Sequence, residues 1–593
     1  MKTLPFVHLV PKIWDKKATY TMADLYNPFA QHAARAVANT LELDESLFVV
    51  SEPPNPEFGD IAVGCFPAAK ALKKSPAQIA TMVADAFGGN EFLKSATAKG
   101  PFVNFWVHPQ KLIECAVERT VKSHALFNDS LGAGKTICVD FSSPNISKQL
   151  AYHHIRSTVI GNALCKMHRA LGYHVMGINH LGDWGTTHGM VIEAYNRWGH
   201  EGELDVAALN ELYVRFRNEM KTDPTLADAG REAFAKLEQG DERTVSLWNR
   251  FKELSLKEFQ TIYDILNIEF DEIKGESQYA EDVPKVLKEL DDKGLSSMSD
   301  GALVVEFEEK EDMPPLLLRK KDGSTLYGTR DIAAAHYRKD KYNFEKSYYV
   351  VGRGQGLHFK QLFKTLSLAG HAWSEDCKHI PFGLVRIAGK KTSTRSGQSI
   401  LLKDVFDEAQ KNATEKIQSK NPDMPQNTLK ASAQTVGVGA VVFANLMRER
   451  DKDVDFVLED ILSTDGDSGP YVQYAYARLC QVFNKTSQKP SLDADFSKLG
   501  STHEKRLAHI IMNFGDVVER ATRHCDPHIV SRYLLDLASE VSRFYTAGNQ
   551  DKALRILCED EATQIARLTL VKSVQVTLET GLELLGVGVV ENM

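Results

Sequence analysis

The segment from Val139 to Thr158 constrains the fold of this chain more than any other part of the sequence. It begins in an apolar run of β type (136–141), passes through a polar turn that contains Pro144 and Asn145, and enters a helical pattern. A strand, a polar turn and a helix start with histidine and arginine is how a doubly wound sheet presents a nucleotide site. The segment therefore predicts an α/β domain that binds a nucleotide at the start of this helix.

Length and composition set the limits for the rest of the chain. A chain of 593 residues is too long for one hydrophobic core, so we expect three or four domains. Its 43% hydrophobic and 25% charged residues are typical of a globular protein. The 71 basic and 79 acidic side chains give a net charge of −8, so any nucleic acid must be bound through local basic patches.

The cysteines and the apolar runs exclude several classes of protein. The eight cysteines are scattered without a C-x-x-C pair, which argues against a cysteine zinc site or a disulfide framework and favours a reducing cytoplasm. No apolar run approaches the roughly 20 residues of a membrane span. Residues 1–22 lack the features of a signal peptide, and we expect an extension of doubtful order, with Met22 as an alternative start.

The remaining chain divides into three regions with different patterns. Residues 23–115 read as a small α+β domain, whose best local signal is a helix capped by Ser75 and Pro76. Short apolar runs alternate with helices from 116 to 430, as a parallel sheet requires, and a charged helical stretch at about 190–295 predicts an insertion. Residues 431–593 predict an all-α bundle. The strands expected in the parallel sheet are 136–141, 173–179, 301–307, 346–352 and 380–387.

Several strings together carry a resemblance to a known family. They are D-F-S-S-P-N-I-S-K (140–148), N-H-L-G-D-W-G (179–185), T-L-Y-G-T-R-D (325–331) and V-G-R-G-Q-G-L-H-F (351–359). With F-G-D (58–60), G-P-F-V-N-F (100–105) and several strings after 435, they resemble class I arginyl-tRNA synthetases in the correct order over residues 23–593. The resemblance implies a Rossmann-type catalytic domain, an N-terminal domain that binds the tRNA elbow and a C-terminal anticodon-binding bundle. It also implies a mostly monomeric arginine–tRNA ligase that uses ATP and Mg²⁺.

The resemblance assigns the phosphate chemistry to two loops. His154 occupies the second histidine of the family's His-x-Gly-His signature, and Lys148 precedes that signature. The string K-T-S-T-R (391–395) replaces the Lys-x-Ser-Lys-Ser loop and lacks its second lysine, whose role Lys148 is then expected to take. Donors aimed where charge develops on the α-phosphate provide electrostatic catalysis. The catalytic residues implied are Lys148, His154 and Lys391, and the ATP-binding residues are His153, His154, Ser157, His180, Gly182, Asp183, His358, Ser393 and Arg395.

Recognition of arginine needs carboxylates, because a guanidinium is planar, always charged and pairs with Asp or Glu in a bidentate manner. Taken alone, Asp331 reads as a helix N-cap, and the turn at Asp183 reads nearly as well as a structural turn. The resemblance instead implies an arginine pocket of Asp140, Ser142, Asn145, Tyr327, Asp331 and Gln355.

The C-terminal bundle is expected to contact the anticodon of the arginine tRNA. Tyrosine and arginine suit bases that have left the stack, although a tyrosine-rich helix more often packs in a core. The residues implied are Tyr471, Tyr474, Arg478 and Met593.

The chain departs from the family at the signature itself. The expected His-x-Gly-His reads Ala151-Tyr152-His153-His154, which removes one phosphate-side donor and places a side chain where adenine approaches a glycine. Two alternatives therefore stay open beside arginine–tRNA ligase. One is a catalytically impaired paralogue that retains tRNA binding, and the other is a class I ligase for another amino acid.

Overall fold

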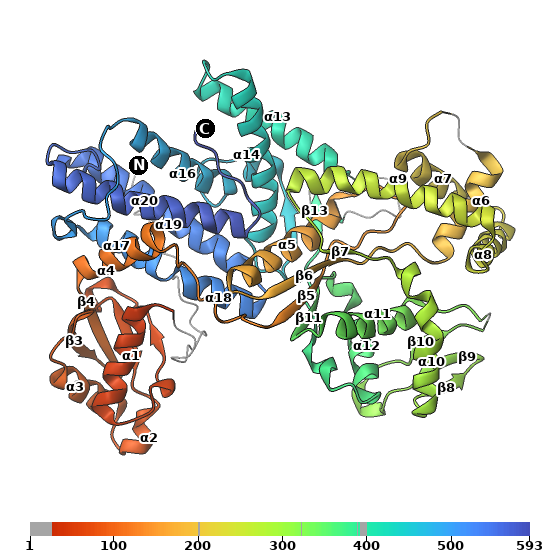
Figure 1. Ribbon diagram of the computed structural model, residues 1–593, viewed down its shortest axis with the longest axis horizontal. Helices are drawn as coiled ribbons and strands as arrows, with labels where there is room; N and C mark the ends of the chain where they lie inside the picture. Colours follow the sequence, from red (N-terminus) through yellow and green to blue (C-terminus); the bar gives the residue numbers. More distant parts are fainter. Residues whose placement is uncertain (1–25, 200–201, 322, 388–389, 392–399) are drawn as a thin grey trace, which may run out of the picture.

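The computed structural model describes residues 26–199, 202–321, 323–387, 390–391 and 400–593 (Figure 1). The extension 1–22 lies outside this part of the chain. Three regions follow one another in the sequence: a small α+β domain, an α/β domain and a helical bundle. Within the described ranges, no helix has both the length and the apolar character that a membrane span needs.

The α/β domain is built on a five-stranded parallel sheet with the order β12-β11-β5-β6-β7. The chain runs outward from β5 to β7 and then returns to add β11 and β12 on the other side of β5. The switch point therefore lies between β5 and β11, where ligands bind in sheets of this kind. The strands are β5 (Thr136–Asp140), β6 (His174–Asn179), β7 (Glu272–Ile273), β11 (Lys346–Tyr349) and β12 (Cys377–His379).

Helices with buried faces connect these strands. The crossover between β5 and β6 is α5, in which Ile155, Val159, Ala163 and Leu164 are buried against the sheet and the bundle. The other crossovers carry α11 and α12, which pack over the opposite half of the sheet. The helices are α5 (Ile155–Ala170), α10 (Val283–Asp292), α11 (Tyr327–Tyr342) and α12 (Gly356–Leu368).

The helical insertion is present but ends earlier than predicted. Its four helices pack on one another around Leu209, Phe234 and Phe251. The predicted end at about 295 is wrong, because β7 and α10 already belong to the parallel-sheet domain and its outer helices. The insertion helices are α6 (Thr186–Trp198), α7 (Val206–Glu219), α8 (Thr225–Glu238) and α9 (Glu242–Leu266).

Two of the five predicted strands need correction. The run 301–307 forms β9 in a separate antiparallel sheet, because its neighbours on both sides are hairpin partners, not crossover strands. The run 380–387 follows β12 instead of forming it, and only its end becomes β13, which pairs with β14 and β15. These strands are β8 (Ser296–Ser299), β9 (Ala302–Val305), β10 (Leu316–Arg319), β13 (Val385–Ile387), β14 (Lys390–Lys391) and β15 (Val454–Phe456).

The N-terminal domain places helices on a four-stranded antiparallel sheet of order β1-β2-β4-β3. The helix α3 begins at Pro76 with Ser75 as its N-cap, as the sequence predicted, and Gln78 completes a capping box. Ion pairs from Asp60 to Lys505 (2.8 Å) and from Glu52 to Arg506 join the domain to the bundle. Its elements are α1 (Pro28–Leu41), β1 (Val50–Ser51), β2 (Ile61–Gly64), α2 (Ala68–Leu72), α3 (Pro76–Ala86), β3 (Leu93–Lys99) and β4 (Phe102–Val107).

The C-terminal region is a helical bundle, as expected. The predicted boundary at 430–431 falls inside α14, which packs against both α13 and α16. Arg156 on α5 is buried and donates to the carbonyls of Lys452 and Arg450, so the signature helix is attached to the bundle side. Its helices are α13 (Leu402–Lys420), α14 (Gln426–Leu446), α15 (Leu458–Ile461), α16 (Gly469–Asn484), α17 (Thr502–Met512), α18 (Phe514–His524), α19 (His528–Gln550) and α20 (Glu561–Leu584). The helix α4 (Pro109–Val117), which follows the N-terminal domain, packs against α17 and α20.

Candidate active site

The predicted site residues gather at the carboxyl ends of the central strands. Asp140 ends β5, His180 follows β6, and Gln355 lies in the loop between β11 and α12. Tyr327 and Asp331 come from the first turns of α11, which packs on this sheet. The site therefore lies at the switch point, where parallel strands and helix N-termini face a ligand together.

A carboxylate held by two imidazoles forms the centre of the pocket. His358 Nε2 lies 2.7 Å from Asp331 Oδ2, and His180 Nε2 lies 3.5 Å from Oδ1. The Tyr327 ring packs edge-on against His358, with centroids 4.8 Å apart. The helix-cap alternative for Asp331 is wrong, since α11 begins four residues earlier, at Tyr327.

The charges of this cluster are set by the protein. Burial would raise the pKa of Asp331, but the contacts with His180 and His358 outweigh it and hold the pKa of the carboxyl below its usual range. Burial opposes ionisation of His180 as well, yet its contact with Asp331 and the charge of Asp140 raise the pKa of its imidazole. Asp331 remains 21% exposed, so a charged carboxylate is accessible to a ligand.

Asp140 already has a cationic partner within the protein. Arg338 Nη2 lies 2.7 Å from its Oδ2, and the Ser143 hydroxyl donates to its Oδ1 at 2.8 Å. Both members of the ion pair are buried. The carboxylate therefore serves first to neutralise Arg338 under the pocket, a contact that the sequence did not predict.

The turn after β5 has an unusual backbone geometry. Ser142, Ser143 and Ser147 all adopt positive φ, at 67°, 47° and 62°. The Ser142 hydroxyl bonds with those of Tyr263 and Thr158, at 2.9 Å each. Ser142 is thus buried beneath the pocket and helps to hold the turn in this shape.

Ser157 locks the same turn to the sheet. Its hydroxyl donates to the carbonyl of Val350 at 2.6 Å and accepts the backbone N–H of Ser142 at 3.0 Å. These bonds join the ends of β5 and β11 to the first turn of α5. Ser157 consequently acts on the predicted nucleotide site through the position of this turn.

The signature turn holds its second histidine through backbone contacts. His154 Nδ1 lies 3.0 Å from the N–H of Ala151 and 3.1 Å from its carbonyl, so the backbone of Ala151 holds the ring and leaves Nε2 without a role in this turn. The turn also pairs with the segment 400–402: the Tyr152 N–H donates to Ile400 O and the Leu402 N–H to Leu150 O. Ala151 is only 1% exposed, so its contribution comes from its backbone.

Both signature imidazoles are neutral. Burial and the nearby His153 lower the pKa of His154 to about 3, and burial together with the charge of Lys148 lowers the pKa of His153. Their rings lie 4.0 Å apart, and His153 Nδ1 is buried without a hydrogen-bond partner in the structure. Lys148 extends its ammonium over the ring of Tyr213 in the insertion, 4.6 Å from its centroid.

The turn after β6 contains Gly182, which lies close to Asn145, and the buried Asp183. A Cβ on Gly182 would lie 1.9 Å from Asn145 Oδ1, so glycine lets the Asn145 amide keep its position where the two turns pair. Asp183 is 0% exposed and accepts from Lys252 Nζ at 2.7 Å and from Ser277. The direct ATP contact predicted for Asp183 is therefore not available, and its contacts are those of the structural alternative.

Sequence reasoning missed one acidic residue of the pocket. Glu276, after β7, lies 2.8 Å from Arg330, is partly buried, and has a raised pKa because its desolvation outweighs the nearby Arg330 and His180. The negative charge of Asp331 also raises the pKa of Glu276. The only sequence signal was the string G-E-S at 275–277, which fell inside the range assigned to the helical insertion.

The remaining predicted residues are placed as follows. Asn145 and Gln355 are exposed, and Tyr327 is 49% exposed. Ser393 and Arg395 lie outside the described residues, as does the side chain of Lys391. Among the tRNA candidates, Arg478 stacks on Tyr545 (3.6 Å), Lys420 lies over Tyr474 (5.1 Å), Tyr471 is half-buried, and Met593 packs at the end of the bundle.

Three family profiles match successive parts of this chain. Residues 27–107 match the arginyl tRNA synthetase N-terminal domain, and residues 116–458 match the catalytic domain of tRNA synthetases class I (R). Residues 472–593 match the DALR anticodon-binding domain.

Individual relatives agree with these profiles over the whole chain. An arginine–tRNA ligase of Clostridium botulinum is 43% identical over 96% of this chain and 100% of its own length. One of Clostridium beijerinckii is 43% identical over 93% of this chain and 97% of its own. The structure of Thermus thermophilus arginyl-tRNA synthetase superposes with a TM-score of 0.81 at 26% identity, covering 95% of this chain and all of that one.

Proposed function

This chain belongs to the arginyl-tRNA synthetase family, and from that premise we propose how its residues share the recognition of arginine, ATP and tRNA. It is an arginine–tRNA ligase. Such an enzyme uses ATP to activate the carboxylate of arginine and then transfers the arginyl group to the 3′ end of the tRNA. The observation that carries the residue assignment is the Asp331 carboxylate, which two histidines keep charged at the switch point of the sheet.

Asp331 is proposed to bind the guanidinium of the substrate. Its Oδ1 has the longer of the two imidazole contacts and therefore keeps acceptor capacity for a second donor. Tyr327 lies at the rim, and Asn145 and Gln355 are proposed to hold the α-amino and carboxyl groups. Because a buried polar site leaves its own groups unpaired with an apolar analogue, it rejects such analogues strongly.

Asp140 and Ser142 are proposed to support this pocket from below, and Glu276 is added to it. Asp140 contributes to the raised pKa of His180 and is itself neutralised by Arg338. Glu276 is partly buried beside Arg330, the residue that precedes Asp331 in α11. These groups tune the charge of the pocket, whereas Asp331 offers the accessible carboxylate.

His154 is proposed to donate its Nε2 proton to the α-phosphate as a neutral imidazole. A donor fixed before the reaction stabilises the charge that develops there without reorganising. Lys148 is proposed to leave Tyr213 and supply a positive charge to the phosphates. His153, His180, Gly182 and His358 remain proposed neighbours of ATP, as do Lys391, Ser393 and Arg395.

Mg²⁺ is proposed to arrive with the phosphates of ATP. Within the described residues, the one group of three ligand-type side chains close enough to hold a metal is Glu289, His336 and His371, none of which belongs to the signature. Mg²⁺ typically keeps phosphate oxygens and waters as ligands. The residues at the signature therefore fit ATP phosphates better than they fit a bare ion, and no step is assigned to the metal.

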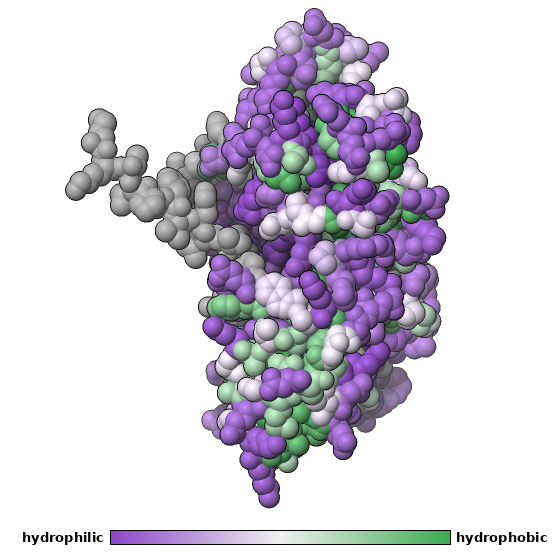
Figure 2. Space-filling view, turned by 90° about the vertical axis from the view of Figure 1, so that its left-hand side faces the viewer, coloured by the Kyte–Doolittle hydropathy of each residue, from purple (hydrophilic) through white to green (hydrophobic). Residues whose placement is uncertain are grey.

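The tRNA is proposed to contact both terminal domains. Tyr474, Arg478 and Met593 lie within the part of the chain that matches the DALR domain, and Tyr471 directly precedes it. The three residues of α16 are half-buried, and Met593 packs against residues of α13 and α14. Figure 2 shows apolar side chains gathered on the lower part of the face that the N-terminal domain forms. Within this domain, Phe66 and Phe102 are 57% and 37% exposed and pack edge-on at 5.7 Å, an arrangement suited to unstacked bases of the tRNA elbow. The protein is further proposed to act as a monomer in the cytoplasm.

Aminoacylation of purified arginine tRNA with each of the twenty amino acids tests the assignment. We expect charging with arginine alone and dependence on ATP. Charging with none would favour the impaired paralogue, and charging with another amino acid would favour a ligase of different specificity. Binding of tRNA measured in parallel separates an inactive catalytic domain from a chain that does not fold.

A further inference from the structure

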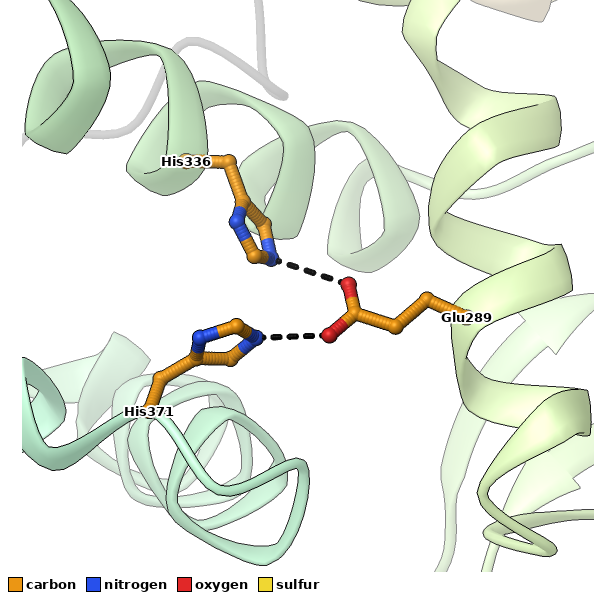
Figure 3. Close-up of side chains that lie close together, drawn as sticks. All are labelled: Glu289, His336 and His371. Carbon is orange, nitrogen blue, oxygen red and sulfur yellow. Dashed lines mark hydrogen bonds and ion pairs between the residues drawn. The ribbon is translucent and has the colours of Figure 1, made fainter.

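A second cluster of ligand-type side chains lies behind the pocket helices. Glu289 on α10, His336 on α11 and His371 after α12 point toward one another (Figure 3). His371 Nε2 lies 2.7 Å from Glu289 Oε1, and His336 Nε2 lies 3.5 Å from Oε2. His336 is five residues beyond Asp331, which is about 7.5 Å along the helix axis and on a different face. The cluster is therefore separate from the arginine pocket.

The surroundings leave the cluster partly open to solvent. The three side chains are 27%, 24% and 21% exposed, in the order Glu289, His336 and His371. Trp373 closes one side and packs on both imidazoles, at 5.6 Å from His336 and 5.2 Å from His371. Burial and the neighbouring His371 lower the pKa of His336, so its ring keeps a free lone pair at neutral pH.

We propose that Glu289, His336 and His371 form a binding site for a divalent transition-metal ion, with Zn²⁺ as the best-suited ion. Two imidazoles and one carboxylate are a common zinc ligand set, which leaves a fourth position for water. Bond lengths of about 2.0 Å in a tetrahedron place ligand atoms about 3.3 Å apart. One ligand atom from each of the three residues lies within 4.8 Å of the other two. The 2.7 Å and 3.5 Å contacts of His371 and His336 end on different oxygens of Glu289, so small side-chain movements bring one oxygen and both nitrogens to the tetrahedral spacing.

The positive charge of Lys293 opposes the binding of a metal ion by Glu289. Its ammonium lies 2.6 Å from Glu289 Oε1 and also donates to the carbonyl of Ala369. Oε2, on the side of His336, is not engaged by this lysine in the structure. A metal bound through Oε2 gains both imidazoles but feels the repulsion of a nearby positive charge. Removing the charge of Lys293 should consequently tighten metal binding.

A metal at this position would join three elements of the catalytic domain. It links α10 and α11 to the loop that follows α12. The opposite ends of α11 and α12 carry Asp331 and His358. Binding only to the folded state would stabilise this arrangement by mass action, so zinc should raise the unfolding temperature of the protein.

The test is a zinc titration of the purified, metal-stripped full chain against a chromophoric zinc chelator, repeated with Co²⁺ and read by visible absorption. We expect one equivalent bound at micromolar or tighter Kd, with at least tenfold weaker binding in His336→Ala and in His371→Ala. His503→Ala is the matched control, because His503 pairs with Glu540 at the same 2.7 Å, while Arg543 is the second partner of that carboxylate. This variant should bind zinc like the unaltered chain.

Lys293→Met should change zinc binding in the opposite direction from the histidine variants. It should tighten binding several-fold if a metal binds beside Lys293, and it should leave binding unchanged if the contact of Lys293 with Glu289 is only structural. Circular dichroism identifies any variant that does not fold, and the Co²⁺ spectrum of the unaltered chain tests for tetrahedral ligands without substitution. The proposal is overturned if the unaltered chain binds no more zinc than the folded His336→Ala variant, or if Lys293→Met binds zinc no more tightly.

Discussion

The arginine pocket and the signature turn lie at the same edge of one sheet, but they prepare their ligand contacts differently. In the pocket, His180 and His358 hold the Asp331 carboxylate in its charged form before any substrate arrives. At the signature, burial keeps His153 and His154 neutral, and backbone contacts orient them. Recognition of a permanent cation benefits from a preset charge, whereas a phosphate that changes charge during reaction benefits from a fixed dipole.

The two regions also differ in what supports them. The pocket rests on α11 and α12, whose side chains contact one another and the strands beneath. The signature turn pairs with residues 400–402, directly after the segment that contains Ser393 and Arg395. Substitutions in the pocket should therefore weaken the recognition of arginine, and substitutions in the signature should lower the rate of adenylate formation.

The largest effect is expected from Asp331→Asn. The change keeps the shape of the side chain but removes the charge that opposes the guanidinium. Loss of one partner of a buried charge pair typically costs roughly 2–4 kcal/mol, and kcat/KM for arginine should fall accordingly with little change in the KM for ATP. Asp340→Asn, at the exposed end of the same helix, is the control. Nearly normal arginine kinetics would remove Asp331 from the pocket.

His154→Ala tests the other region. Losing one preoriented donor typically costs about 10²-fold in turnover, so adenylate formation measured by pyrophosphate exchange should slow by about this factor. Arginine affinity should be roughly preserved. His174→Ala removes an exposed histidine from β6 and should have no effect. Equal rates in the two variants would show that His154 does not face the α-phosphate.

His358→Phe separates charge tuning from packing in the pocket. The ring still packs beside Tyr327, but Asp331 loses its 2.7 Å hydrogen bond. Burial then acts with less opposition and raises the pKa of the carboxyl. A carboxylate binds the guanidinium only above its pKa, so affinity for arginine should be lost at higher pH than in the unaltered chain.

The expected change is a KM for arginine that rises as the pH falls, with the rise beginning at a higher pH than in the unaltered chain. The unaltered chain is measured over the same pH range, because His180, whose pKa is raised by its contact with Asp331, titrates in both proteins. His379→Phe is the control, because His379 stacks on the same Phe359 but has the Val351 carbonyl, 2.9 Å from its Nε2, as its partner in place of Asp331. The same pH profile in both variants would mean that His358 contributes packing alone.

The sequence predicted those parts of the site that local patterns determine. The strand ends at Asp140 and Asn179 follow from apolar runs bounded by turns, and the family resemblance led to Tyr327 and Asp331. Contacts between distant residues were not predictable: Arg338 reaches Asp140 across 198 positions. The strand β7 has two residues, which is too few for a periodic signal. The sequence pattern therefore does not show where the helical insertion ends.

The smallest effect is expected from restoring the family signature with Ala151→His and His153→Gly. The orientation of His154 depends on the backbone N–H of Ala151, which the substitution keeps. Ala151 is 1% exposed, so the new imidazole has little room and gives little advantage. Arginine charging should change by less than about tenfold, or about 1.4 kcal/mol in the barrier. A gain of several orders of magnitude would instead show that the two departures disable the phosphate side, and that the preset pocket alone does not sustain the reaction. Measuring kcat and the KM for ATP in the double variant and in each single variant assigns any such gain to the missing donor or to the extra side chain.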